Sequence, residues 1–156
     1  HPAAPPPAAP HPPGGRPPAT PPSCTGVTPS AFINASPRSS AVLERGLVTY
    51  SNEAKTTLLG VDRALIAAHG AVSAEVCAAM ARGALAASAA DTAVAVTGIA
   101  GPGGATETKP VGLVFLATMM RGGAPAVERH VFGGDRSEVR RATLARALTL
   151  LLQQVG

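Results

Sequence analysis

Residues 44–61 read ERGLVTYSNEAKTTLLGV, and this stretch decides the fold because it joins a strand, a polar corner and the start of a helix. Leu47 to Tyr50 are aliphatic, β-branched or aromatic, which suits a buried strand. Ser51 or Asn52 can cap a helix through a side-chain oxygen. The helical spacing that follows is carried by Ala54, Lys55, Leu58 and Leu59.

The corner places polar side chains where a strand ends and a helix begins. These are Tyr50, Ser51, Asn52, Glu53 and Lys55. In open α/β sheets, ligands bind beyond the carboxyl ends of the strands. Corners of this kind also occur in many α/β proteins without any chemistry, so a core Tyr50 and a solvated Lys55 fit the pattern equally well. The sequence therefore predicts a candidate site here but leaves its chemistry open.

Composition favours one domain that binds a small anion. The chain has 156 residues, of which 46% are hydrophobic and 3% aromatic, so Ala, Val and Leu must build the core. The formal net charge is +4. No run of Lys and Arg exceeds two residues and the aromatic residues are scattered, which disfavours binding of nucleic acid.

The cysteines and apolar runs disfavour other classes of protein. Cys24 and Cys77 lie far apart without metal-ligand spacing, so we expect reduced thiols and no metal. The apolar run at 111–120 is too short to cross a bilayer. No secretory signal is evident at the N-terminus. We expect a soluble cytoplasmic protein without a membrane partner.

The chain divides after residue 22. Residues 1–22, HPAAPPPAAPHPPGGRPPATPP, are predicted to be a disordered or irregular tail, because proline removes backbone donors and fixes φ. The folded domain is predicted over 23–156. Its first part, 23–43, is predicted to contain a short helix that starts after the Thr28–Pro29 pair.

The later elements follow from periodicity and capping signals. Helices are predicted over 61–69, closed by Gly70, and after the cap Ser73. Strands are predicted over 92–97, 111–118 and 126–132, the first buried on both faces. Asp135 and Glu138 form a capping box that opens the last helix. Its predicted apolar stripe is Val139, Leu144, Leu148, Leu151 and Leu152.

Two features could bind an anion. The loop Gly98–Lys109, GIAGPGGATETK, follows a strand, and its backbone amides could face a ligand. A plain hairpin connection is the alternative reading. Arg136 and Arg140 lie one turn apart at the start of the last helix, where cations oppose the helix dipole unless an anion is near. A solvated basic face explains them equally well.

Five segments of the chain carry a specific resemblance to a known family. They read SCTG at 23–26, SSAVLERGLVTYSNEAK at 39–55, GVDRALIAAHGAVSAEV at 60–76, VTGIAGPGGATETKPVG at 96–112 and FGGDRSEVRR at 132–141. Together they resemble the CinA C-terminal domain family, which includes the nicotinamide-nucleotide amidohydrolases. The resemblance covers 23–156 nearly without gaps. Some members are also fused to a larger N-terminal domain, which this sequence does not contain.

The resemblance implies a fold and a reaction. The expected fold is α/β, a three-layer α/β/α sandwich in a single domain. The expected reaction is hydrolysis of the carboxamide of nicotinamide mononucleotide to nicotinic acid mononucleotide and ammonia. It needs no cofactor, and it would place the protein in the pyridine nucleotide cycle. The resemblance is also compatible with a homodimer.

The resemblance also implies the site residues. Ser23 is the expected nucleophile, Lys55 its base, and Tyr50 lies between them. Free amides near Cys24 and Thr25 would stabilise the oxyanion. The substrate-binding residues are then Cys24, Thr25, Gly26, Thr97, Gly98, Gly101, Arg136 and Arg140.

The chain departs from the family pattern around Ser23. The family pattern is similar to ESCTGG, whereas Pro22 precedes Ser23 here and Val27 replaces the second glycine. A glycine usual after Pro37 is Arg38. A catalytically silent domain that binds a nucleotide or a protein is therefore the alternative function. A changed reading frame in the N-terminal coding region would explain the change in composition there, and sequencing the DNA in all frames would test that hypothesis.

Overall fold

The computed structural model describes Thr49 and residues 51–155. The predicted tail, the predicted helix after Pro29 and most of the predicted strand 47–50 lie outside the described residues. The described elements, in chain order, are α3 (Asn52–Leu59), α4 (Arg63–His69), α5 (Ala74–Ala86), β1 (Thr92–Gly98), β2 (Leu113–Met120), β3 (Ala126–Val131) and α6 (Arg136–Val155).

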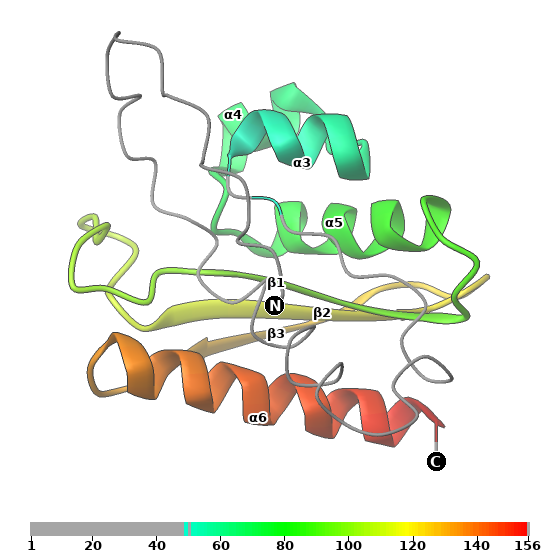
Figure 1. Ribbon diagram of the computed structural model, residues 1–156. Coiled ribbons are helices and arrows are strands. Elements are labelled where there is room, and N and C mark those ends of the chain that lie inside the picture. Colours follow the sequence, from blue (N-terminus) through cyan, green and yellow to red (C-terminus); the bar gives the residue numbers. More distant parts are fainter. Residues whose placement is uncertain (1–48, 50, 156) are drawn as a thin grey trace, which may run out of the picture.

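The elements form three layers. The described strands make an antiparallel sheet in the order β1-β2-β3, with Val96 opposite Leu116 and Leu116 opposite Glu128. Helices α3, α4 and α5 lie on one side of this sheet and α6 lies on the other (Figure 1). The arrangement is the predicted α/β/α sandwich in a single domain.

Most helix starts lie where the capping signals predicted them. Ser51 Oγ accepts a hydrogen bond from Ala54 N at 2.9 Å, so Ser51 rather than Asn52 caps α3. Ser73 caps α5 in the same way. The capping box of α6 is confirmed, because Asp135 Oδ1 accepts from Glu138 N at 2.9 Å and Glu138 Oε1 accepts from Asp135 N at 3.4 Å.

Helix α4 begins later than predicted. It starts at Arg63, not at residue 61, because the side chain of Asp62 accepts a hydrogen bond from Ala64 N and so acts as the cap. Val61 is part of the turn between the helices and is 1% exposed in the core. Gly70 ends α4 as expected.

The sheet separates two apolar clusters. Leu113, Phe115 and Ala117 of β2 belong to the cluster beneath α5, whereas Val114 and Leu116 belong to the cluster that includes Val139 of α6. Strand β2 is thus buried on both faces. The prediction that the strand at 92–97 is buried on both faces was wrong, because β1 alternates between half-buried and buried residues up to Thr97. Its half-buried Val94 and Val96 lie on the face toward the α6 cluster.

The predicted apolar stripe of α6 was only partly right. The buried residues of α6 are Val139, Thr143, Ala147 and Leu150. Leu144, Leu148 and Leu151 are half-buried, and Leu152 is 68% exposed. Small side chains such as Thr143 and Ala147 let a helix lie close to a sheet. The prediction missed them because hydropathy alone favours the larger leucines for the buried face.

Two arginines connect elements that are distant in sequence. Arg121, after β2, donates from Nη2 to the carbonyls of Leu85, Ser88 and Ala90 at the end of α5. These bonds hold the turn that follows α5 against the end of β2. Arg146 of α6 forms an ion pair with Glu128 of β3, whose pKa is lowered to about 2 by hydrogen bonds from Arg146 and then His130.

The close packing of α5 against α3 depends on Gly83. A Cβ atom added to Gly83 would lie 1.8 Å from the carbonyl oxygen of Leu59, the last residue of α3. The two backbones can therefore approach this closely only when residue 83 has no side chain.

Replacing Gly83 with Ala should destabilise the fold, although alanine is the better helix former. Relieving the overlap requires α3 to shift, and overpacking of this kind typically costs about 1–3 kcal/mol. Urea denaturation measures the difference. Gly133→Ala is the control, because a Cβ atom there meets nothing within 4 Å. A Gly83→Ala variant at least as stable as the parent would contradict the packing argument.

Candidate functional site

Lys55 has its side chain buried beneath the start of α3. It is 3% exposed, and its Nζ donates a hydrogen bond to the carbonyl oxygen of Thr49 at 3.1 Å. Burial disfavours the charged form and lowers the pKa of Lys55 below its usual 10.5. The alternative of a solvated Lys55 is therefore wrong. The geometry gives an amine that can lose its proton more readily than a surface lysine.

The backbone around Lys55 is fixed at both ends of its helix. Ser51 caps the start of α3, and the N–H groups of Gly60 and Val61 donate to carbonyls of its last turn, including that of Lys55. Gly60 has a positive φ of 65°, as expected for a residue that ends a helix. The position of Lys55 is thus set by local capping together with the packing of α3 on α5.

The glycine-rich segment follows β1 as a hairpin connection, because β1 and β2 are antiparallel neighbours. Thr97 is 2% exposed, and its hydroxyl donates to the carbonyl oxygen of Ala71 at 2.8 Å. Gly98 pairs with Val114, and Gly98 and Gly101 are both buried, whereas residues 102–108 are exposed. The path is the predicted hairpin, and a ligand role for its amides stays a prediction.

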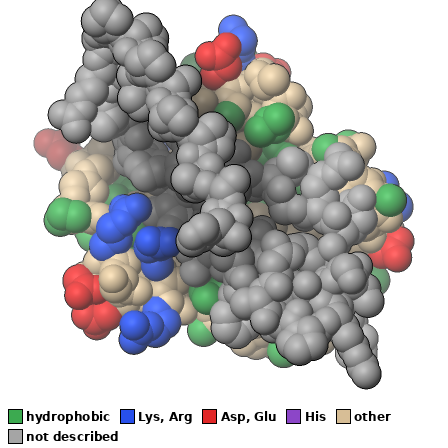
Figure 2. All heavy atoms as spheres, viewed as in Figure 1, with side chains coloured by type: hydrophobic (Ala, Val, Ile, Leu, Met, Phe, Trp, Pro, Cys, Tyr) green, Lys and Arg blue, Asp and Glu red, His purple; other side chains and the backbone are tan. Residues whose placement is uncertain are grey.

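The start of α6 lies against this segment. Arg136 donates from Nη1 to the carbonyl oxygen of Gly101 at 3.2 Å, which brings two predicted binding residues together. Arg140 is half-buried one turn further along, and its neighbour Arg141 is exposed. Figure 2 shows Lys and Arg side chains gathered at the end of the molecule where α6 begins. Helix α3 begins at the same end (Figure 1).

Five predicted site residues lie outside the described residues. They are Ser23, Cys24, Thr25, Gly26 and Tyr50. The sequence did not predict the carbonyl oxygen of Thr49 as the partner of Lys55, because a backbone acceptor leaves no signal in residue type. It also assigned no role to Lys109, which contacts α4.

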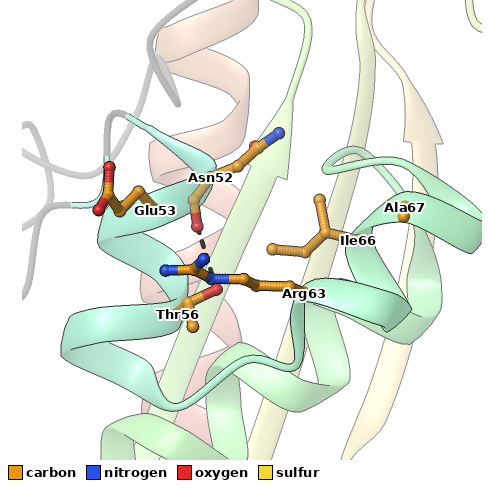
Figure 3. A pocket seen from close by; sticks show the side chains of 6 residues that line it. All are labelled: Asn52, Glu53, Thr56, Arg63, Ile66 and Ala67. Carbon is orange, nitrogen blue, oxygen red and sulfur yellow. Dashed lines mark hydrogen bonds between the residues drawn. The ribbon is translucent and has the colours of Figure 1, made fainter.

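A pocket of about 420 Å³ lies between α3 and α4 (Figure 3). It is lined by Asn52, Glu53, Thr56, Arg63, Ile66 and Ala67. Asn52 and Glu53 belong to the predicted polar corner, but none of the six is among the catalytic or substrate-binding residues that the family resemblance implies, and only Ile66 is buried. Lys55 is on the same helix but has its amine on the buried side.

Three further features of the described residues concern a cysteine, metal ligands and helix length. Cys77 is fully buried, and burial raises the pKa of its thiol to about 12, so it is a poor nucleophile. Thr49 and residues 51–155 contain no group of three His, Cys, Asp or Glu that could hold a metal ion. Over the same residues, every helix is too short or too polar to span a bilayer.

The buried amine should leave a signature in the pH dependence of stability. Unfolded Lys55 keeps its proton up to about pH 10.5, whereas folded Lys55 loses it at lower pH. Burial of the charged amine therefore destabilises the folded protein fully at pH values below the pKa of folded Lys55. This destabilisation is relieved as the pH rises through that pKa. The stability of the parent relative to Lys55→Met should therefore rise as the pH approaches 10.5 from below in urea denaturation series. A difference that does not change with pH would contradict burial of the amine.

Comparison with known proteins identifies the family. The family model described as the CinA C-terminal domain matches residues 17–155. The nicotinamide-nucleotide amidohydrolase PncC of Escherichia coli K12 is 50% identical over 132 residues, covering 85% of this chain and 80% of that protein. A CinA-like protein of Citrifermentans bemidjiense is 55% identical over 129 residues. The chain spans only 31% of the length of that longer relative.

Solved structures agree with this assignment. The competence/damage inducible protein CihA of Agrobacterium tumefaciens superposes with a TM-score of 0.83 at 46% identity, covering 86% of this chain and 82% of that chain. A CinA superfamily protein of Escherichia coli gives a TM-score of 0.80 at 32% identity, covering 85% and 76%. With the family model matching most of its length, the chain belongs to the CinA C-terminal domain family.

Proposed function

We propose that this protein is a nicotinamide-nucleotide amidohydrolase. It would hydrolyse the carboxamide of nicotinamide mononucleotide to nicotinic acid mononucleotide and ammonia. The observation that carries the proposal is the buried amine of Lys55, held on the carbonyl oxygen of Thr49. The Escherichia coli relative, at 50% identity, is named a nicotinamide-nucleotide amidohydrolase, which supports the same reaction.

Lys55 is proposed as the base because its environment favours the neutral amine. A neutral amine can donate one N–H to the carbonyl of Thr49 and still offer its lone pair to a proton. Burial lowers the pKa of Lys55, which raises the fraction of the neutral form near pH 7. A charged, solvated lysine could not accept the proton of a serine hydroxyl.

The proposed reaction proceeds in two balanced steps. Ser23 Oγ transfers its proton to Lys55 Nζ and forms a bond to the carboxamide carbon; ammonia then leaves with that proton, giving an acyl-serine. A water molecule next gives a proton to Lys55, attacks the acyl carbon and releases the acid, and the proton returns to Ser23. Tyr50 orients the hydroxyl and the amine, and amides near Cys24 and Thr25 stabilise the oxyanion.

The phosphate of the substrate is assigned to the start of α6. Arg140 would bind it, and Arg136 would hold the carbonyl of Gly101 as it does in this structure. A helix N-terminus with arginines is a natural phosphate site. Thr97, Gly98 and Gly101 would border the nucleotide from the glycine-rich segment. The proposal requires no cofactor or metal, and it places the reaction in the cytoplasm, in the pyridine nucleotide cycle, with a homodimer as a compatible assembly.

A catalytically silent binding domain is the second candidate function. The observation that favours it is the sequence around Ser23, where Pro22 and Val27 depart from the family pattern. Such a domain would keep the anion site at α6 and the buried Lys55 but would not align the nucleophile. Binding of nicotinamide mononucleotide without release of ammonia distinguishes it from the enzyme.

The first test of activity is ammonia release from nicotinamide mononucleotide by the parent, Lys55→Met and Ser23→Ala. Lys55→Met removes the amine and keeps much of the stem, so the turnover number should fall by about two to four powers of ten. Ser23→Ala should abolish turnover as completely. Arg129→Met is the matched control, because it removes an exposed cation from β3 and should keep full activity.

An active parent whose folded Lys55→Met variant is equally active would refute the role of Lys55. A parent that binds nicotinamide mononucleotide but releases no ammonia would reject the amidohydrolase and favour the silent domain. Activity that survives Ser23→Ala would remove Ser23 from the mechanism.

The second test concerns the phosphate site. Arg140→Ala should raise the KM for nicotinamide mononucleotide about tenfold or more, since a hydrogen bond to a charged group is lost. The KM for nicotinamide riboside, which lacks the phosphate, should not change. Arg141→Ala is the matched control, because Arg141 is the exposed neighbour on the same helix. Equal effects of Arg140→Ala on both substrates would contradict phosphate binding by Arg140.

A further inference from the structure

We propose that Lys109 is a positioning residue that holds the glycine-rich segment against the end of α4 and thereby sets the affinity of the site for its nucleotide. The effect on affinity rests on the proposed function. The positioning rests on contacts in the structure and can be measured without substrate.

The contact joins two parts of the chain that are 40 residues apart. Lys109 Nζ donates to the carbonyl oxygen of His69 at 2.7 Å. His69 is the last residue of α4, where the carbonyls lack partners within the helix and carry the negative end of its dipole. A lysine amine is therefore well matched to this position. Lys109 and Lys55 are the only two lysines in the chain.

The bond itself is exposed to solvent, but the amine lies close to the backbone after α4. Lys109 is half-buried, although residues 102–108 before it are exposed. A Cβ atom on Gly70 would lie 2.7 Å from Lys109 Nζ, so the amine packs directly over the backbone that follows α4. At its own end, Lys109 closes a small turn: its N–H donates to Thr106 Oγ1 and its carbonyl accepts from Thr106 N.

Lys109 and Arg136 hold the same segment from opposite layers. Arg136, on α6, donates to the carbonyl of Gly101. Lys109, in the part of the segment that leads into β2, binds to α4 on the opposite side of the sheet (Figure 1). The exposed part between these two anchors is glycine-rich at 103–104 and has little apolar surface to bury. Without an anchor, the conformational entropy of such a loop opposes a single arrangement.

The anchor bears on the proposed site through the α4–α5 connection. The carbonyl of Ala71, two residues after His69, accepts from the hydroxyl of Thr97 at the end of β1. The end of α4 and the connection after it thus contact both arms of the hairpin, at Lys109 and at Thr97. Loss of the Lys109 contact should loosen the turn between Thr106 and Lys109. The base of the hairpin, where Gly112 N donates to Ile99 O at 2.7 Å, should not change.

The experiment compares the parent with Lys109→Met and Lys109→Arg by two readouts. Hydrogen exchange reports the amides of Thr106 and Lys109, with the amide of Gly112 as an internal reference. Kinetics with nicotinamide mononucleotide separates KM from kcat. In Lys109→Met, exchange at 106 and 109 and the KM should each rise about tenfold, with kcat changed less than about threefold, as for loss of one charge-assisted hydrogen bond. Lys109→Arg keeps a cationic donor and should restore both values.

Each outcome decides the proposal. A folded Lys109→Met variant with unchanged exchange overturns the anchoring. Faster exchange with an unchanged KM overturns the role of Lys109 in binding. A lower melting temperature with no change in KM does the same. Failure of Lys109→Arg to restore either readout overturns the hydrogen bond as the cause. A parent that neither binds nor turns over nicotinamide mononucleotide rejects the proposed function instead, and the exchange data then decide the anchoring by themselves.

Discussion

The burial of one amine constrains the geometry of the site. Lys55 lies in the core at 3% exposure, and a buried amine needs a hydrogen-bond partner. That partner is the carbonyl oxygen of Thr49, in the segment that leads into α3. The bond therefore fixes how the chain enters the helix. The close approach of α3 to α5 depends in turn on the bare backbone at Gly83.

The site end of the molecule is also held by bonds between layers. The glycine-rich hairpin has few side chains to bury, so its packing cannot define its shape. Hydrogen bonds from Arg136, Lys109 and Thr97 replace that packing, and they join the hairpin to α6, to α4 and to the α4–α5 connection. Each of these donors binds a backbone carbonyl, so the arrangement depends on the course of the chain and little on the identity of the acceptor residue.

Features that depend on neighbouring residues were the most predictable from sequence. The caps Ser51 and Ser73 and the capping box of Asp135 and Glu138 act over three residues, and the structure confirms them. The buried face of α6 was mispredicted because hydropathy does not show how close the sheet lies. The sequence could not predict the hydrogen-bond acceptors of Arg121, about 31 to 36 residues away, or that of Lys109. Only the folded topology brings these groups together.

The division of the site between segments separates affinity from turnover. The described residues contain the proposed base, the hairpin and the arginines of α6, whereas the proposed nucleophile, Ser23, lies outside them. Binding energy from the phosphate acts on a part of the substrate that does not react, and it can be kept when the nucleophile is misplaced. The departures at Pro22 and Val27 flank Ser23, so in the proposed mechanism they bear first on the chemical step, and on binding through the neighbouring Cys24, Thr25 and Gly26. In that mechanism, phosphate binding depends on the described start of α6, and catalysis depends on one additional segment.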